Sequence, residues 1–451
     1  MDEKDKIIQE LKITIEKLTI RIEELEKRLG LNSKNSSKPP SSDGFKKLPP
    51  SSLRQKGKNS SGGQKGHEGH TLNQVGNPDK IIRHELTNCP HCKNQLSKEV
   101  IGLTKRQVFD IPPVKMEVTE HQAEIKICSC CKKEVCAEFP IGVNVPAQYG
   151  PRIKAQAVYL GVQHFIPEDR LQIIFQDLYG AKIATATLVK FSNDLAGNLD
   201  GFYQKVLEKI KFAALKHMDE TGFRISGKTA WLHVASDEKL TYYHSSPKRK
   251  SLLEGVIGTV VHDHWKPYYQ MNVAHALCNA HHLRELQALI EDKEAWAKKM
   301  KKLLLFMHKY RQLFVDEIPK EKTNRLDKIY NKIIEEGLGY HLKRRKNLIY
   351  GGMFTRKRYP GHNLLLRLKN YRSDVLRFLY DPTIPFTNNQ AEQDLRMMKL
   401  KQKISGGFRT TNGAEVFIRI RTFLSTARKQ GWDIFNTLAN SINGEIPLPV
   451  S

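Results

Sequence analysis

Three acidic segments carry the residues best suited to chemistry. The stretch KFAALKHMDETGF reads as an apolar strand that ends in acid at Asp219, and IGTVVHDHW reads as a second strand that runs into Asp263. The stretch TNNQAEQDLR is typical of a helix start and carries Glu392. A carboxylate at the end of a core strand is costly to bury unless a partner or a metal compensates its charge. Three of them at one sheet edge would form the two-metal site that phosphoryl transfer uses.

Any one of these acids alone is more often a turn or capping residue on a solvated surface, and only their combination favours a site. Glu220, Asp237 and Asp394 are the main rivals for the three roles. Carboxylate oxygens are the ligands that Mg²⁺ prefers. The expected catalytic cofactor is therefore Mg²⁺ or Mn²⁺.

The predicted helix that begins near Asn388 carries cations as well. Arg396, Lys399 and Lys403 follow Glu392 at spacings that place all four on one helix face. The GGFR turn that follows adds Arg409. Such a face could track a phosphate backbone, so we predict that these four cations contact DNA. The alternative is an exposed helix whose ion pairs contribute about 0.3 kcal/mol each.

The composition points to a polyanionic partner. The chain has 451 residues with 74 Lys and Arg against 48 Asp and Glu, which gives a formal net charge of +26. Nucleic acid is the simplest partner for such an excess, although a basic protein that merely stays soluble is the alternative. No apolar run reaches a membrane span and no secretory signal opens the sequence, so we expect a cytoplasmic, nucleoid-associated protein.

The first 30 residues predict a coiled-coil helix. Its apolar residues follow alternating steps of three and four, and they are Ile8, Leu11, Ile15, Leu18, Ile22, Leu25 and Leu29. We therefore expect a homo-oligomer formed through this helix. Residues 31–80 are rich in Asn, Ser, Pro, Gly and Lys and predict a flexible basic linker. The linker could follow a phosphate backbone or serve only as a solvated tether.

Residues 81–140 predict a zinc-binding ribbon. Of the seven cysteines, six fall between Cys89 and Cys136, in CPHC and CSCC clusters. Two Cys-x2-Cys pairs can place four thiolates around a structural Zn²⁺, which replaces the core that so small a module lacks. The expected ligands are Cys89, Cys92, Cys128 and Cys131. The competing candidates are Cys130, Cys136 and His91.

The remaining sequence predicts a divided α/β core. Residues 141–205 are helical with a helix-turn-helix-like spacing, although helical hairpins that touch no DNA are far commoner. Residues 206–284 predict strands around a helix near 250–255, residues 285–380 a helical insertion, and residues 381–445 the second part of the core with two helices, 388–403 and 412–440. The order of strands, crossover helix and acid-bearing strand is typical of a ribonuclease-H-like fold.

One further pair of residues could bind a metal. Cys278 and His281 lie in CNAHHLREL, within a helix predicted at 274–290. Two ligands do not make a site, so the favoured interpretation is core packing of the cysteine beside a hydrogen-bonded histidine.

With these residues in hand, the chain resembles transposases of the insertion-sequence-66 family over nearly its whole length. The shared motifs are NSSKPPSSD, GGQKGHEGHTL, CPHC with CSCC, MDETG, CNAHHLREL and NNQAEQDLR. The resemblance implies a DDE transposase in which Asp219, Asp263 and Glu392 bind divalent metals. It also implies cutting at terminal inverted repeats, joining of 3′-hydroxyls to target DNA, and roles in assembly and end recognition for the coiled coil and zinc module.

The sequence thus predicts a multidomain α+β protein: coiled-coil helix, linker, zinc ribbon, helical DNA-binding region, and ribonuclease-H-like core with a helical insertion. The predicted function is that of a DNA transposase acting on double-stranded element ends and target, with the need for helper proteins left open. Two alternatives remain. The chain could be an inactive, transposase-derived DNA-binding regulator, or a nuclease that cuts without joining.

Overall fold

The computed structural model describes residues 71–112, 114–140, 142–349 and 359–450, together with Asn35 and separate helical positions between 7 and 29. Most of the predicted linker therefore lies outside the described residues. The seam residues of the N-terminal helix are helical. Their side chains are exposed, from 44% for Leu25 to 85% for Leu29. Among the described residues we find no helix with the length and hydrophobicity needed to cross a bilayer.

The described chain forms mixed helix and sheet. The strands are β1 (Ile125–Ile127), β2 (Glu134–Cys136), β3 (Leu215–Ile225), β4 (Lys228–Ser236), β5 (Thr241–Ser246), β6 (Thr259–His262) and β7 (Ala274–Leu277). The first helices are α2 (Pro151–Val158), the π-helix η2 (Tyr159–Gln163), α3 (Glu168–Tyr179), α4 (Thr185–Asn198) and α5 (Asp200–Phe212). The later ones are the 3₁₀ helix η3 (Lys266–Gln270), α6 (Asn279–Glu291), α7 (Ala295–Arg311), α8 (Lys320–Ile349), α9 (Pro360–Asn370), α10 (Arg372–Tyr380), α11 (Asn389–Ser405), α12 (Thr411–Lys429) and α13 (Ile434–Ile442).

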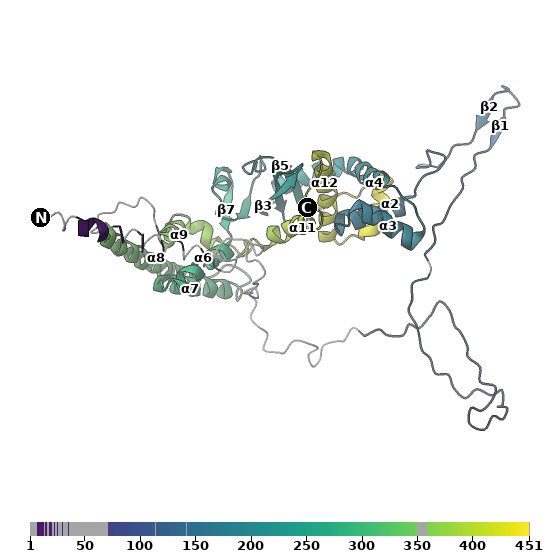
Figure 1. The fold of residues 1–451 in the computed structure, drawn as a ribbon, viewed down its shortest axis with the longest axis horizontal. Coiled ribbons are helices and arrows are strands. Elements are labelled where there is room, and N and C mark those ends of the chain that lie inside the picture. The colour runs from purple at the N-terminus through teal and green to yellow at the C-terminus, as the bar shows by residue number, and fades with distance from the viewer. Residues whose placement is uncertain are drawn as a thin grey trace.

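A five-stranded sheet in the order β5-β4-β3-β6-β7 organises the molecule (Figure 1). Strands β3, β4 and β5 form an antiparallel meander, and β6 and β7 extend it with parallel pairing. Two sequence predictions are wrong here. Residues 250–255 form turns and bends instead of a helix, and Ala274–Leu277 is the edge strand β7, so the helix predicted at 274–290 begins only at Asn279. The segment AHAL has no β-branched residue, so its strand conformation comes from parallel pairing with β6, which local propensity does not record.

Strand β3 does not end at Asp219 as the sequence suggested. It continues to Ile225 because it pairs with β4 along almost its whole length, from His217 opposite Ser236 to Ile225 opposite Lys228. Its parallel pairing with β6 is much shorter and stops at His217 opposite Val261. Asp219 therefore lies in the middle of a long strand, two residues beyond the point where its parallel neighbour ends.

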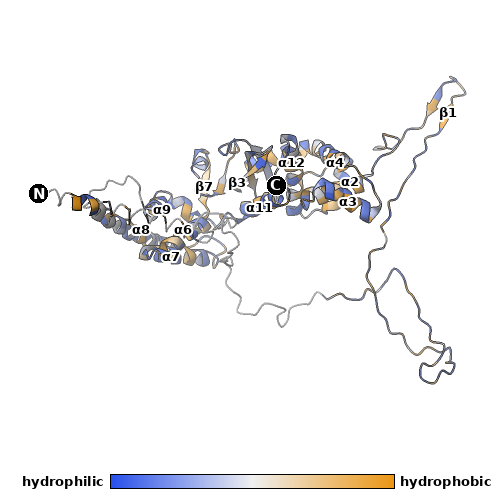
Figure 2. Ribbon diagram, in the orientation of Figure 1, coloured by the Kyte–Doolittle hydropathy of each residue, from blue (hydrophilic) through white to orange (hydrophobic). Residues whose placement is uncertain are grey.

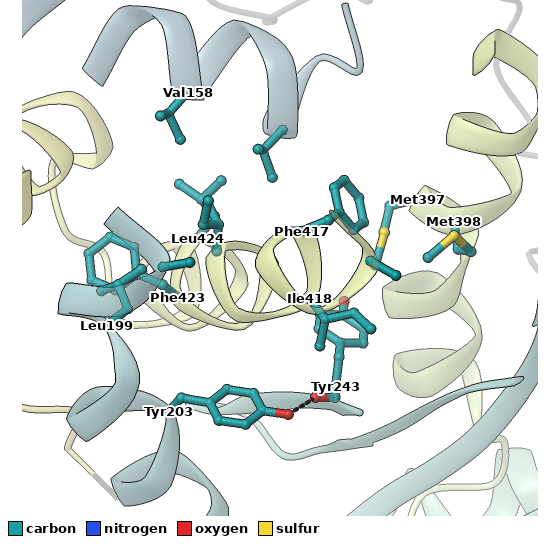
Figure 3. Close-up of a cluster of buried hydrophobic side chains, with 14 of the residues drawn as sticks. Val158, Leu199, Tyr203, Tyr243, Met397, Met398, Phe417, Ile418, Phe423 and Leu424 are labelled. Atoms are coloured by element: carbon teal, nitrogen blue, oxygen red, sulfur yellow. Dashed lines mark hydrogen bonds between the residues drawn. The ribbon is translucent and has the colours of Figure 1, made fainter. Parts of the chain in front are cut away.

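Helix α12 runs through the centre of the first hydrophobic core, which includes residues from α2–α5 and the antiparallel strands. Figure 3 shows Phe417, Ile418, Phe423 and Leu424 of this helix among side chains contributed by neighbouring elements. Most positions of α12 beyond Phe417 are buried, as expected of a helix surrounded by other elements. The helices of 141–205 thus share one core with the sheet.

The same helix covers the exposed edge of the sheet at β5. The backbone N–H groups of Thr241 and Tyr243 each donate to a threonine hydroxyl of α12, to Thr426 and Thr422 respectively, at 3.2 Å. An uncovered edge strand presents unpaired N–H groups that invite association with another strand. The predicted helix 412–440 is in fact two helices, α12 and α13, which are separated at Gly431, where φ is +70°.

The helical insertion forms a second core on the other side of the sheet. Helices α6–α10 bury their apolar faces against β6 and β7, so Val260 belongs to the first core and the adjacent Val261 to the second. Neighbouring strand residues point to opposite faces, which explains this division. Figure 2 shows hydrophilic and hydrophobic residues side by side along these helices, as in amphipathic helices. The described part of residues 285–380 is mainly helical.

Gly258 offers a test of how β6 is placed. Its φ is +80°, and a Cβ built on it would lie 2.5 Å from the carbonyl oxygen of Ala214. We expect Gly258→Ala to destabilise the fold by about 2 kcal/mol or more, since both the backbone strain and the close approach would have to be relieved. Thermal melting of the full-length protein measures the loss.

Gly339→Ala is the matched control, because Gly339 lies inside α8 and a Cβ added there would meet no atom of another element within 4 Å. This substitution should stabilise the helix by about 0.5–1 kcal/mol. Equal melting temperatures for the two variants would show that position 258, directly before β6, tolerates a side chain.

Candidate active site

The two predicted aspartates meet at the carboxyl end of β6. Asp263 follows the last residue of β6 directly, and Asp219 lies on the adjacent strand β3 just past the last parallel pair. Because β6 stops there while β3 continues, the sheet opens at this point and leaves both side chains only partly covered. Asp219 thus lies on β3, and Asp263 comes directly after the neighbouring strand β6.

The backbone fixes one carboxylate oxygen of each aspartate. Oδ1 of Asp219 accepts the N–H of Glu220 at 2.9 Å, and Oδ1 of Asp263 accepts the N–H of Trp265 at 2.8 Å. Among the described residues, Oδ2 of neither aspartate accepts a further hydrogen bond. Each side chain is thus oriented by the backbone one or two residues further along its own segment and keeps one oxygen for another ligand.

The charges of the acids act on one another. Burial raises the pKa of Asp219 well above its usual value, and neighbouring carboxylates raise it further. These carboxylates belong to Glu220, Asp263 and Glu392. All three predicted acids therefore share one electrostatic environment, even though Glu392 is distant from the others in sequence.

Asn388 holds the start of α11 against β3. Its side-chain Oδ1 lies 2.8 Å from Nδ1 of His217, and its Nδ2 donates to the carbonyl of Met218 at 2.8 Å. Asn388 occupies the N-cap position, yet its side chain makes no capping hydrogen bond with its own helix. It bonds to β3 instead, and Glu392, one turn later, lies near enough for its charge to act on Asp219. Asn388 is not among the predicted site residues, although an asparagine before an amphipathic helix is a recognisable start signal.

Glu392 is held in its ionised form. Burial alone would raise its pKa, but the contact with His281 and the charges of Arg284 and Arg396 outweigh that effect and lower the pKa. Oε1 of Glu392 lies 3.6 Å from Nε2 of His281. Glu392 is therefore already charged and able to bind a cation. Asp219, in contrast, resists ionisation until a positive charge compensates its own.

Glu220, one of the rival acids, is engaged elsewhere. It points away from Asp219, to the opposite face of β3. The hydroxyl of Tyr268 donates to Oε2 of Glu220 at 2.7 Å, and the guanidinium of Arg249 donates to Oε1 at 2.6 and 2.9 Å. Arg249 itself lies over the rings of Trp231 and Trp265. Glu220 therefore has a structural role: it holds Tyr268 and Arg249 on the face of β3 opposite to Asp219.

The other two rivals also have structural partners. Asp394 forms an ion pair with Lys429 of α12 at 3.0 Å, and both side chains are largely buried. Asp237 accepts the N–H groups of Lys239 and Leu240 in the turn between β4 and β5. Both acids are accounted for by the fold.

The four predicted DNA-contacting cations are exposed. Arg396, Lys399 and Lys403 lie along α11, and Arg409 follows in the next turn. Nζ of Lys399 donates to the carbonyl of Gly222 at 3.1 Å, so this row begins beside the strand that carries Asp219. The GGFR turn is anchored to the same strand, because the N–H of Phe408 donates to the carbonyl of Arg224 at 2.9 Å.

The two cysteine pairs adopt matching turns. The N–H groups of Cys89 and Cys128 each donate to a carbonyl five residues later at 2.9 Å. The residues after the second cysteines, Lys93 and Lys132, have φ of 63° and 59° and donate back to the first cysteine. Hydrogen bonds from the backbone of the second cysteine lower the pKa of the first thiol in each pair. That shift favours the thiolate, the form that binds metal.

The structure does not bring every predicted ligand set together. Among the described residues, one group of three His, Cys, Asp or Glu has its ligand atoms all within 4.8 Å of one another, and it consists of Cys278, His281 and Glu392. Neither the four ribbon cysteines nor the three acids form such a group in the described chain. The second pair of cysteines lies in the β1–β2 hairpin, which stands away from the rest of the molecule in Figure 1.

Comparison with known proteins gives matches in three parts of the chain. The family described as "Transposase IS66 family" matches residues 146–416, and "zinc-finger binding domain of transposase IS66" matches residues 87–132. A family of unknown function (DUF6444) matches residues 1–73. An uncharacterized protein, y4jO, of Sinorhizobium fredii is 30% identical over 90 residues, which are 20% of this chain and 28% of that protein. The chain thus spans less than a third of the length of this relative.

The raised pKa of Asp219 leads to a stability prediction. An acid whose folded-state pKa is raised contributes stability below its unfolded pKa and loses it as the pH rises through the folded pKa. In metal-free buffer near pH 7.5, Asp219→Asn should therefore raise the melting temperature, because asparagine mimics the protonated acid. The gain should disappear as the pH approaches about 4, the usual pKa of aspartate.

Asp177→Asn, on the exposed side of α3, is the matched control and should leave the melting temperature nearly unchanged. A lower melting temperature for Asp219→Asn at neutral pH would contradict the like-charge account of this site.

Proposed function

The chain belongs to the IS66 family of transposases, and we propose that it cuts the ends of its DNA element and joins the freed 3′-hydroxyls to target DNA. Asp219, Asp263 and Glu392 are the proposed ligands of two Mg²⁺ or Mn²⁺ ions. The observation that supports this proposal is the position of Asp219 and Asp263 on adjacent elements of the sheet, with Glu392 near enough for its charge to raise the pKa of Asp219. The strand order supports a ribonuclease-H-like core, with β3 central and β6 parallel to it.

The donor set fits divalent metals. All three groups offer carboxylate oxygens, and their mutual repulsion is the kind that a bound cation relieves. When bound, two such ions supply activation of the attacking oxygen and stabilisation of the leaving oxygen. The protein's own part is to hold the ligands: the backbone N–H groups of Glu220 and Trp265 orient the aspartates, and Asn388 sets the position of Glu392.

The exposed cations along α11 form a path for DNA that leads outward from the three acids. Arg396, Lys399, Lys403 and Arg409 are proposed to contact phosphates, in keeping with the formal net charge of +26. The hydrogen bond from Lys399 to the carbonyl of Gly222, on the strand that carries Asp219, supports a path that leads toward the proposed ligands. Phosphate contacts position DNA without reading its sequence, so end recognition is assigned to other parts of the chain.

The N-terminal parts are proposed to serve assembly and end recognition. The exposed seam of the first helix suits a coiled coil between copies of the chain. The matching turns at Cys89 and Cys128 suit a single Zn²⁺ held by Cys89, Cys92, Cys128 and Cys131, with Cys130 and Cys136 left outside. Such a site requires the β1–β2 hairpin to fold back onto the first pair.

DNA containing the inverted repeats that flank the gene is the substrate for the central test. With Mg²⁺, the wild type should cleave 3′-ends and join them. Asp219→Asn, Asp263→Asn and Glu392→Gln should each lower the cleavage rate more than about a hundredfold, since each removes a metal ligand. Glu254→Gln, in the exposed loop before β6, is the matched control and should retain the wild-type rate.

The outcomes separate the competing functions. Wild-type rates in all three variants would refute the proposed site. Specific end binding without any cleavage by the wild type would favour a DNA-binding regulator. Cleavage without joined products would favour a nuclease.

The ribbon has its own test. Cys89→Ser should lower the zinc content by about one equivalent and unfold residues 81–140, because the metal replaces a core there. Metal analysis and limited proteolysis of the full-length protein measure the two effects, and the sheet-containing core should remain resistant. Cys136→Ser is the matched control, and an unchanged zinc content in Cys89→Ser would reject the ligand assignment.

A further inference from the structure

Cys278 and His281 have no part in the chemistry proposed above, yet they form a cluster with Glu392, which is one of its proposed ligands. Its thiol sulfur, imidazole nitrogen and carboxylate oxygen all lie within 4.8 Å of one another. They come from three places: the end of β7, the first turn of α6 and the first turn of α11. The sequence suggested core packing for the first two residues because it offered only two ligands. The fold supplies the third from a distant helix.

The chemistry of this ligand set differs from that of the aspartates. Thiolate and imidazole are ligands for Zn²⁺ and Co²⁺, whereas Mg²⁺ takes oxygen ligands in an octahedral arrangement. Three protein ligands with mixed sulfur, nitrogen and oxygen donors leave a fourth tetrahedral position for water. The cysteine and histidine are three residues apart at the start of a helix, so both can face the same ion.

The surroundings hold the ligands in place. The backbone N–H of Asn388 donates to Sγ of Cys278 at 3.1 Å, and the side chain of Asn388 is itself fixed on β3. Cys278 is 1% exposed, while the side chains of His281 and Glu392 are 23% and 26% exposed. The sulfur is thus anchored by a neighbouring group, as metal ligands commonly are, and the open side gives an ion a way in.

We propose that Cys278, His281 and Glu392 form a second metal site, selective for Zn²⁺ or a similar thiophilic ion, in which binding releases the thiol proton to water. A consequence rests on the proposed function. Glu392 belongs to both ligand sets, so an ion held by Cys278 and His281 withdraws Glu392 from Asp219 and Asp263. Zn²⁺ at this position then inhibits cleavage in Mg²⁺.

Cobalt substitution in the full-length protein tests the binding. Wild type reconstituted with Co²⁺ should hold one equivalent of the ion more than Cys278→Ser does. The variant should also lose about a fifth of the thiolate-to-cobalt absorption, because Cys278 would be one of five cobalt-bound thiolates, with the other four in the ribbon. His281→Gln, whose side chain is partly exposed, should lose the same equivalent. Cys136→Ser is the matched control, and thermal melting verifies that each variant is folded. An equal Co²⁺ content and spectrum in the wild type and both site variants would overturn the proposal.

Cleavage assays then test the shared glutamate. Increasing Zn²⁺ at constant Mg²⁺ should inhibit end cleavage by the wild type and leave Cys278→Ser active. Inhibition of both proteins to the same extent would overturn the sharing of Glu392. The metal content does not depend on cleavage, so an inactive wild type would refute the proposed function while the cobalt result still decides the second site.

Discussion

The central physical constraint in this molecule is the gathering of like charges in a partly buried place. Burial is the largest cause of the raised pKa of Asp219, and the negative charges of Glu220, Asp263 and Glu392 raise it further. Only a rigid scaffold keeps such groups together when no cation compensates them. The sheet provides one half of that scaffold through the early end of β6 beside the longer β3. Asn388 provides the other half by fixing α11 to the backbone of β3.

The two hydrophobic cores explain why this scaffold is rigid. The first core surrounds α12, whose threonines also cover the edge strand β5. The second core is formed by the helical insertion against β6 and β7. Strand β6 belongs to both cores through Val260 and Val261, so neither helical layer can shift without moving the strand that leads to Asp263.

Glu392 links two kinds of metal chemistry. On one side it has carboxylates that suit a hard cation, and on the other it has a thiol and an imidazole that suit a soft one. His281 and two arginines lower the pKa of Glu392 more than burial raises it. The carboxylate is therefore charged and able to bind either kind of cation. A single side chain in the first turn of α11 is thus where catalysis and metal regulation would meet.

Sequence alone determined what depends on residue type and local spacing. It predicted the acids at Asp219, Asp263 and Glu392, the cysteine pairs, the basic face of α11 and the helical insertion, because these patterns lie within single segments. It mistook Ala274–Leu277 for helix and ended β3 at Asp219, since pairing with a distant strand decides both. Only the tertiary structure decided that Asn388 bonds to β3 instead of capping its helix, and that Glu392 lies beside Cys278 and His281. Contacts between residues far apart in the chain depend on how whole elements pack, and no local periodicity records that packing.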